Sequence, residues 1–158
     1  MTHSNSKIQG REIIITRLIK APRELIFEVW TSPEHIKHWY GPNGFTTTTH
    51  EMNLTPGGVW DFTLHGPDGR DYHNRIKFIE IIRPEKLVYK HTGDDDTQPV
   101  DFHATVTFEE NKEATLITMR STFASTGALQ RVVETYGAEE GAKQMLSRLD
   151  DYLVSHNK

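Results

Sequence analysis

The sequence contains no cysteine, so it can form neither a disulfide framework nor a thiolate metal site. It also lacks any apolar run that approaches the roughly 20 residues needed to cross a bilayer. After Met1, the first ten residues include one strongly apolar side chain, that of Ile8, which does not make the apolar segment of a secretory signal. From these absences we expect a cytoplasmic protein that does not insert into a membrane.

Positive charge is not in excess either. The chain has 18 Lys and Arg against 22 Asp and Glu, and its formal net charge is -4. Because a basic face supplies most of the affinity for a phosphate backbone, we expect no nucleic-acid partner. The length of 158 residues and the apolar content of 35% fit one globular domain. We expect a flexible N-terminal tail over residues 1–10 and a single domain over residues 11–156.

The N-terminal part of this domain combines one strand with two short helices. Residues 11–20 carry a β-branched run that is typical of a strand. Pro22 and Pro33 each suit the first turn of a helix, and apolar residues follow both of them at helical spacing. The segment 41–44 (GPNG) ends the second helix.

Residues 45–123 change to a period of two. Apolar and polar side chains alternate through 59–65 and, without a break, through 100–108 and 115–123. This alternation is typical of strands with one buried face. Short turns separate six such strands, so we expect an antiparallel sheet with about seven strands in all.

The C-terminal helix is expected to cover this sheet. Helical spacing resumes after Ser125, and Gly137 suits the left-handed position that ends a helix. The next helix has one long apolar stripe, made of Ala142, Met145, Leu146, Leu149, Tyr152 and Leu153. The predicted fold is therefore of the α+β class, with a curved antiparallel sheet around a long C-terminal helix.

Five segments, read in order, resemble the motifs of a known family. They are residues 21–30 (APRELIFEVW), 32–39 (SPEHIKHW), 57–62 (GGVWDF), 84–89 (PEKLVY) and 115–119 (TLITM). In this order and spacing the chain resembles the START-like (SRPBCC) superfamily, whose fold is called helix-grip or birch-pollen-allergen-like. Within that superfamily it is similar to the family named for the C-terminal domain of the activator of the heat-shock chaperone ATPase. The resemblance runs from about Ile13 to Leu153.

The resemblance implies a cavity between the sheet and the C-terminal helix, where proteins of this superfamily commonly keep one. The family's C-terminal helix often begins with Gly-Trp, whereas this chain has Gly141-Ala142. A methyl group thus replaces an indole beside the expected cavity and reshapes it. From its length we expect no separate N-terminal domain of the kind with which the eukaryotic cochaperone engages its chaperone, so the resemblance leaves a chaperone partner possible but does not carry over that activity.

Aromatic side chains with a few polar tips are the usual lining of small-molecule pockets. The side chains that we expect to converge on the cavity are Trp39, Trp60, Phe62, Phe78, Tyr89, His91, Phe102, Met119, Phe123, Met145 and Leu149. Each of them would also suit simple packing in the core. The set as a whole favours a ligand-binding cavity, because a curved sheet and a helix do not meet flush.

Patterns for catalysis and metal binding are weak. His35 and His38 lie three residues apart on a predicted helix, but the spacing assigns no third ligand. The acidic segment 94–96 lacks the alternation of a calcium loop and suits a solvated loop. There is no G-x-S-x-G motif and no glycine-rich phosphate loop. We therefore predict no metal, no cofactor and no catalytic residue.

Three functional hypotheses stay open. The first is non-catalytic binding of a small apolar or amphipathic ligand. The second is an enzyme of the polyketide cyclase or aromatase kind, in which a buried His91 would be the acid or base and Tyr72 and Arg120 the next residues to mutate. The third is a protein-interaction module that regulates a chaperone ATPase, which would need an exposed apolar patch. The sequence indicates neither the oligomeric state nor the identity of a ligand.

Overall fold

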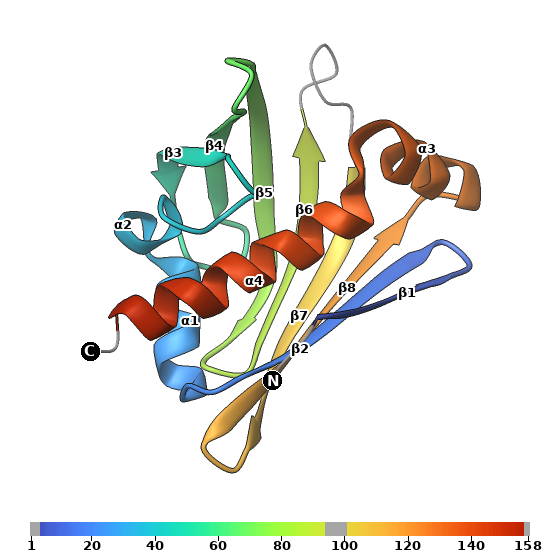
Figure 1. The fold of residues 1–158 in the computed structure, drawn as a ribbon. Helices are drawn as coiled ribbons and strands as arrows, with labels where there is room; N and C mark the ends of the chain where they lie inside the picture. The colour runs from blue at the N-terminus through green and yellow to red at the C-terminus, as the bar shows by residue number, and fades with distance from the viewer. Residues whose placement is uncertain (1–3, 94–100, 157–158) are drawn as a thin grey trace.

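The computed structural model describes residues 4–93 and 101–156, and it confirms the helix-grip fold. One antiparallel sheet of eight strands, in the order β1-β2-β8-β7-β6-β5-β4-β3, curves around a long helix (Figure 1). The strands are β1 (Asn5–Gln9), β2 (Glu12–Ile19), β3 (Thr46–Met52), β4 (Val59–His65), β5 (Asp71–Ile82), β6 (Lys86–Gly93), β7 (Asp101–Asn111) and β8 (Ala114–Phe123). The helices are α1 (Arg23–Thr31), α2 (Pro33–Ile36), α3 (Thr126–Tyr136) and α4 (Ala138–His156).

The corner between α3 and α4 directs the long helix back across the sheet. The Ser125 side chain caps α3 by accepting a hydrogen bond from the backbone nitrogen of Ala128 at 3.0 Å. Gly137 ends α3 in the left-handed conformation predicted for it, with φ 62°. The helix α4 begins at the next residue and runs diagonally over the sheet face, as Figure 1 shows.

The N-terminal residues differ from the sequence prediction. We expected a flexible tail over residues 1–10 and about seven strands, but residues 5–9 form β1 and the sheet has eight strands. Gly10, with φ 61°, permits a tight turn, and β1 pairs with β2 from Asn5↔Thr16 to Gln9↔Glu12. An edge strand is held by backbone hydrogen bonds, which need no apolar pattern, so the polar sequence carried no signal of it.

Buried side chains pack closely at one end of the space between sheet and α4. Leu146 and Leu149 of α4 are fully buried against the sheet. Beside them, Trp30 packs edge-on against Trp39, with ring centroids 5.0 Å apart, and against Phe108, at 5.5 Å. The C-terminal half of α4 therefore lies on solid packing. Within residues 4–93 and 101–156, none of the helices combines the length and the apolar character that a membrane crossing requires.

Candidate ligand-binding cavity

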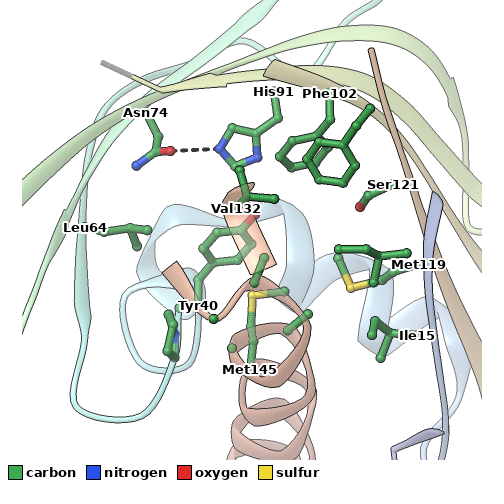
Figure 2. Close-up of a pocket in the computed structure, with 18 of the residues that line it drawn as sticks. Ile15, Tyr40, Leu64, Asn74, His91, Phe102, Met119, Ser121, Val132 and Met145 are labelled. Carbon is green, nitrogen blue, oxygen red and sulfur yellow. Dashed lines mark hydrogen bonds between the residues drawn. The ribbon is translucent and has the colours of Figure 1, made fainter. Parts of the chain in front are cut away.

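A cavity of about 180 Å³ lies between the N-terminal half of α4 and the inward face of the sheet (Figure 2). Its size suits a single ring, since an apolar cavity of about 150 Å³ can hold benzene. No charged side chain of the described chain is among its walls. It is lined by Ile13, Ile15, Tyr40, Gly41, Pro42, Leu64, Asn74, Tyr89, His91, Phe102, Met119, Ser121, Phe123, Val132, Gly137, Ala138, Gly141, Ala142 and Met145.

Small residues at the start of α4 leave this space open. Ala138 and Ala142 face the cavity with a methyl group where a larger side chain would occupy it. Gly141 lets α4 approach the loop between α2 and β3 closely, because a methyl group placed there would lie 3.3 Å from the Cγ atom of Pro42. Ala142, at the position where the family often has a tryptophan, is part of the cavity wall, as expected from the sequence.

A second, outer hollow of about 400 Å³ adjoins the cavity, and the two share Pro42, Leu64, Gly137 and Gly141 in their walls. Its remaining residues are more polar, namely Phe45, Tyr72, Thr135, Glu140 and Gln144. The shared residues mark the boundary between the apolar interior and the surface.

The loop at this boundary is fastened to α4 by side-chain hydrogen bonds. Arg148 Nη1 donates to the carbonyl oxygens of Gly41, at 2.9 Å, and Pro42, at 2.8 Å. The side-chain oxygen of Gln144 accepts from the backbone nitrogen of Asn43 at 3.0 Å. Partial burial lowers the pKa of Arg148, whose guanidinium donates hydrogen bonds to carbonyl oxygens. These contacts hold the loop and the helix in one position.

Two polar side chains, Asn74 and His91, meet at the cavity wall. Asn74 Nδ2 donates to the carbonyl oxygen of Tyr72 at 3.0 Å, and its Oδ1 lies 2.9 Å from His91 Nε2. Aromatic rings surround the imidazole, with the centroid of Phe102 at 4.8 Å and that of Phe62 at 5.9 Å. Burial among these groups lowers the pKa of His91 to about 4, so the ring is neutral at physiological pH.

A pair of buried phenols, those of Tyr40 and Tyr89, adds the other polar contribution. Their side chains are hydrogen-bonded to each other, and both line the cavity. Burial raises the pKa of each hydroxyl above its usual value, so both phenols keep their protons. One phenol hydrogen is used within the pair, so the pair has a second hydroxyl hydrogen that can be donated to another acceptor.

The structure divides the eleven predicted cavity residues into two groups. Six of them line the cavity: Tyr89, His91, Phe102, Met119, Phe123 and Met145. The other five, Trp39, Trp60, Phe62, Phe78 and Leu149, are buried in the packed core instead. For two of these five, Tyr40 stands in the wall instead, because its ring lines the cavity and packs edge-on against Trp60, at 4.9 Å, and Phe62, at 5.7 Å.

Other residues singled out in the sequence lie outside the cavity wall. Arg120 faces the opposite side of the sheet, where its Nη1 atom lies 2.9 Å from Glu12 Oε1. His35 is hydrogen-bonded through Nδ1 to the Tyr152 hydroxyl at 2.7 Å, and the His38 ring stacks on that of Tyr152. No cluster of three potential metal ligands occurs in the part of the chain that the structure describes. The acidic segment 94–96 lies outside the described residues.

Three polar residues of the cavity wall were not predicted from the sequence, although the positions of two of them indicated that their side chains point inward. Asn74 falls between Tyr72 and Ile76 in the inward alternation of β5, and Ser121 falls between Met119 and Phe123 in that of β8. A polar residue at an inward position is informative, because burial without a partner is costly. Tyr40 follows a helix end, where no periodicity indicates the direction of its side chain.

Together, the fold and the cavity define a helix-grip protein with an apolar space beside its C-terminal helix. A family model with the description "Activator of Hsp90 ATPase homolog 1-like protein" matches residues 20–154. The chain belongs to this family, so the resemblance of its motifs is confirmed. A search of curated proteins finds no match.

Solved structures from several bacteria share the architecture. Protein Ms6760 from Mycobacterium smegmatis has 26% sequence identity and a TM-score of 0.84, with 94% of this chain and 95% of that chain covered. A protein from Arthrobacter aurescens also has 26% identity, with a TM-score of 0.88 and coverage of 96% and 91%. DynU16, from the dynemicin biosynthetic locus, has 16% identity and a TM-score of 0.70, with coverage of 94% and 49%, and is similar in fold alone.

Proposed function

We propose that this protein binds a small apolar or amphipathic molecule, about one ring in size, in the cavity between sheet and α4, and releases it unchanged. The observation that carries the proposal is the apolar space beside Ala138 and Ala142, which has a few polar groups on its wall. Pockets that recognise small molecules have this composition. We assign this activity to the cytoplasm, as the sequence led us to expect.

Holding a ligand is better supported than converting one. His91 is fixed by Asn74, which is itself fixed by the backbone of Tyr72, so the imidazole is oriented by the protein. Arg120, which the cyclase hypothesis placed among the residues to mutate, lies on the other face of the sheet. A neutral imidazole without a charged neighbour in the cavity wall is better suited to orienting a ligand than to proton transfer.

A chaperone-regulating surface has less support. It would require a contiguous exposed apolar patch. Among the described residues the exposed large apolar side chains are Ile8, Ile79, Ile82 and Val154, which come from β1, β5 and α4. Binding in the cavity therefore remains the function that the geometry favours.

Methyl NMR tests the proposal directly. Met119 and Met145 line the cavity, whereas Met52 does not, so the methionine methyl groups report on the site and on a control position at once. On titration with p-xylene, a single-ring apolar probe, we expect the Met119 and Met145 signals to shift in a saturable way while that of Met52 stays in place. Native mass spectrometry of freshly purified protein would reveal the chemical class of any co-purifying ligand.

A pair of tryptophan variants separates filling of the cavity from a general effect on α4. Ala142→Trp places an indole in the cavity and is expected to abolish the p-xylene shifts. Val154→Trp adds the same side chain to the same helix at a position that is 62% exposed, and should bind p-xylene as the wild type does. Equal binding by Ala142→Trp and wild type, or no saturable shift in wild type, would refute cavity binding.

A further inference from the structure

The hydrogen bonds around Asn74 determine which nitrogen of His91 carries a proton. The carbonyl oxygen of Tyr72 can only accept, so the Asn74 atom that faces it at 3.0 Å must be the amide nitrogen. The amide oxygen of Asn74 then faces His91 and can also only accept. Nε2 of His91, at 2.9 Å from that oxygen, therefore bears the hydrogen and donates it.

The second nitrogen of the ring is consequently a bare acceptor. A neutral imidazole has one N–H group, and burial keeps this ring neutral because its pKa is lowered to about 4. Figure 2 shows that Nδ1 lies on the side of the ring away from Asn74, near Phe102, another cavity residue. Among residues 4–93 and 101–156, none donates a hydrogen bond to Nδ1.

We infer that His91 makes the cavity selective for neutral ligands that carry an O–H or N–H group, which donates a hydrogen bond to Nδ1. This inference rests on the proposed function and deepens it by naming the ligand class. The hydroxyl groups of Tyr40, Tyr89 and Ser121 can each donate or accept, so they impose no such direction. None of the described residues that line the cavity is a cation that could neutralise a carboxylate, so anionic analogues are excluded.

The test compares p-cresol with p-xylene, two probes of nearly equal shape that differ by a hydroxyl in place of a methyl group. In wild-type protein, isothermal titration should show p-cresol binding at least about ten-fold more tightly, because p-xylene leaves the buried Nδ1 unpaired. The anion p-toluate, of similar width, should not bind. Tighter or equal binding of p-xylene would overturn the inference.

Two variants show whether the preference comes from His91. His91→Phe keeps a ring in the wall but removes the acceptor, so p-cresol should lose its advantage while p-xylene still binds. His103→Phe makes the same substitution at an exposed position of β7 that does not line the cavity, and should keep the wild-type preference for p-cresol. A preference that survives in His91→Phe would overturn the assignment to this residue.

A measurement on the wild type alone keeps the inference testable if His91→Phe does not fold. Two-bond nitrogen–proton NMR correlations of His91 should show Nε2 as the protonated nitrogen and Nδ1 as the bare one. A proton on Nδ1 would refute the inference. If p-xylene shifts the Met119 and Met145 methyl groups but p-cresol has no advantage, the inference fails while cavity binding stands, whereas no shift with either probe refutes the proposed function itself.

Discussion

Acidification should destabilise this protein through one buried histidine, His91. The pKa of its ring is about 4 in the folded state, whereas an exposed histidine of an unfolded chain has a pKa of 6.5. Between these values the unfolded state binds the proton and the folded state does not, so the free energy of unfolding falls as the pH falls. The loss begins near pH 6.5, continues towards pH 4, and is absent above pH 7.

The size of the effect follows from the two pKa values. Each pH unit between them costs about 1.4 kcal/mol, so lowering the pH from 7 to 5 should remove about 2 kcal/mol of stability through His91 alone. Against a typical total of roughly 5–15 kcal/mol, a loss of this size is readily measured.

Urea denaturation followed by tryptophan fluorescence measures the effect at pH 7 and pH 5. The variant His91→Gln cannot take up this proton, so its loss of stability on acidification should be about 2 kcal/mol smaller than that of the wild type. His103→Gln, on an exposed position of β7, controls for removal of a histidine as such and should lose as much stability as the wild type. Equal losses in wild type and His91→Gln would refute the reasoning.

Three further predictions concern packing, the loop at residues 41–44 and a helix cap. Leu149→Ala should lower the free energy of unfolding by about 2–5 kcal/mol in urea, because the side chain is fully buried, whereas Val154→Ala at the exposed end of α4 should change it by less than about 0.5 kcal/mol. Arg148→Met removes the donors to the carbonyls of residues 41–42 and should accelerate amide hydrogen exchange in the 41–45 segment without changing exchange in β7. Ser125→Ala removes the cap of α3 and should cost about 1 kcal/mol in thermal or urea unfolding, whereas Ser125→Asn should restore most of it.

Much of the fold could be predicted because its pattern is periodic. The alternation through β7 and β8 and the apolar stripe of α4 identify their buried faces without any knowledge of partners. Gly137 was predicted as a helix end for a local reason, since its left-handed backbone favours glycine. The strand β1 could not be predicted in this way, because its stability comes from pairing with β2 and not from its own side chains.

The cavity was harder to predict than the sheet that forms its wall. Inward alternation places Trp60 and Met119 on the same face, yet Trp60 packs in the core and Met119 lines the cavity. The difference depends on Tyr40 and on the line along which α4 crosses the sheet, and both are tertiary features. Periodicity therefore shows which side chains point inward, but not where the interior is left unfilled.

The division of α4 into two halves has a consequence for how such proteins diversify. Its C-terminal half, with Leu149 and Leu153, is buried against the core, whereas its first turns, with small residues, border the cavity. Changes confined to the first turns, or to cavity residues such as His91, would alter the size and polarity of the cavity while leaving the packing around Leu149 in place. The architecture is thus compatible with cavities of different size and polarity, and it is shared with solved structures that have only 26% sequence identity to this chain.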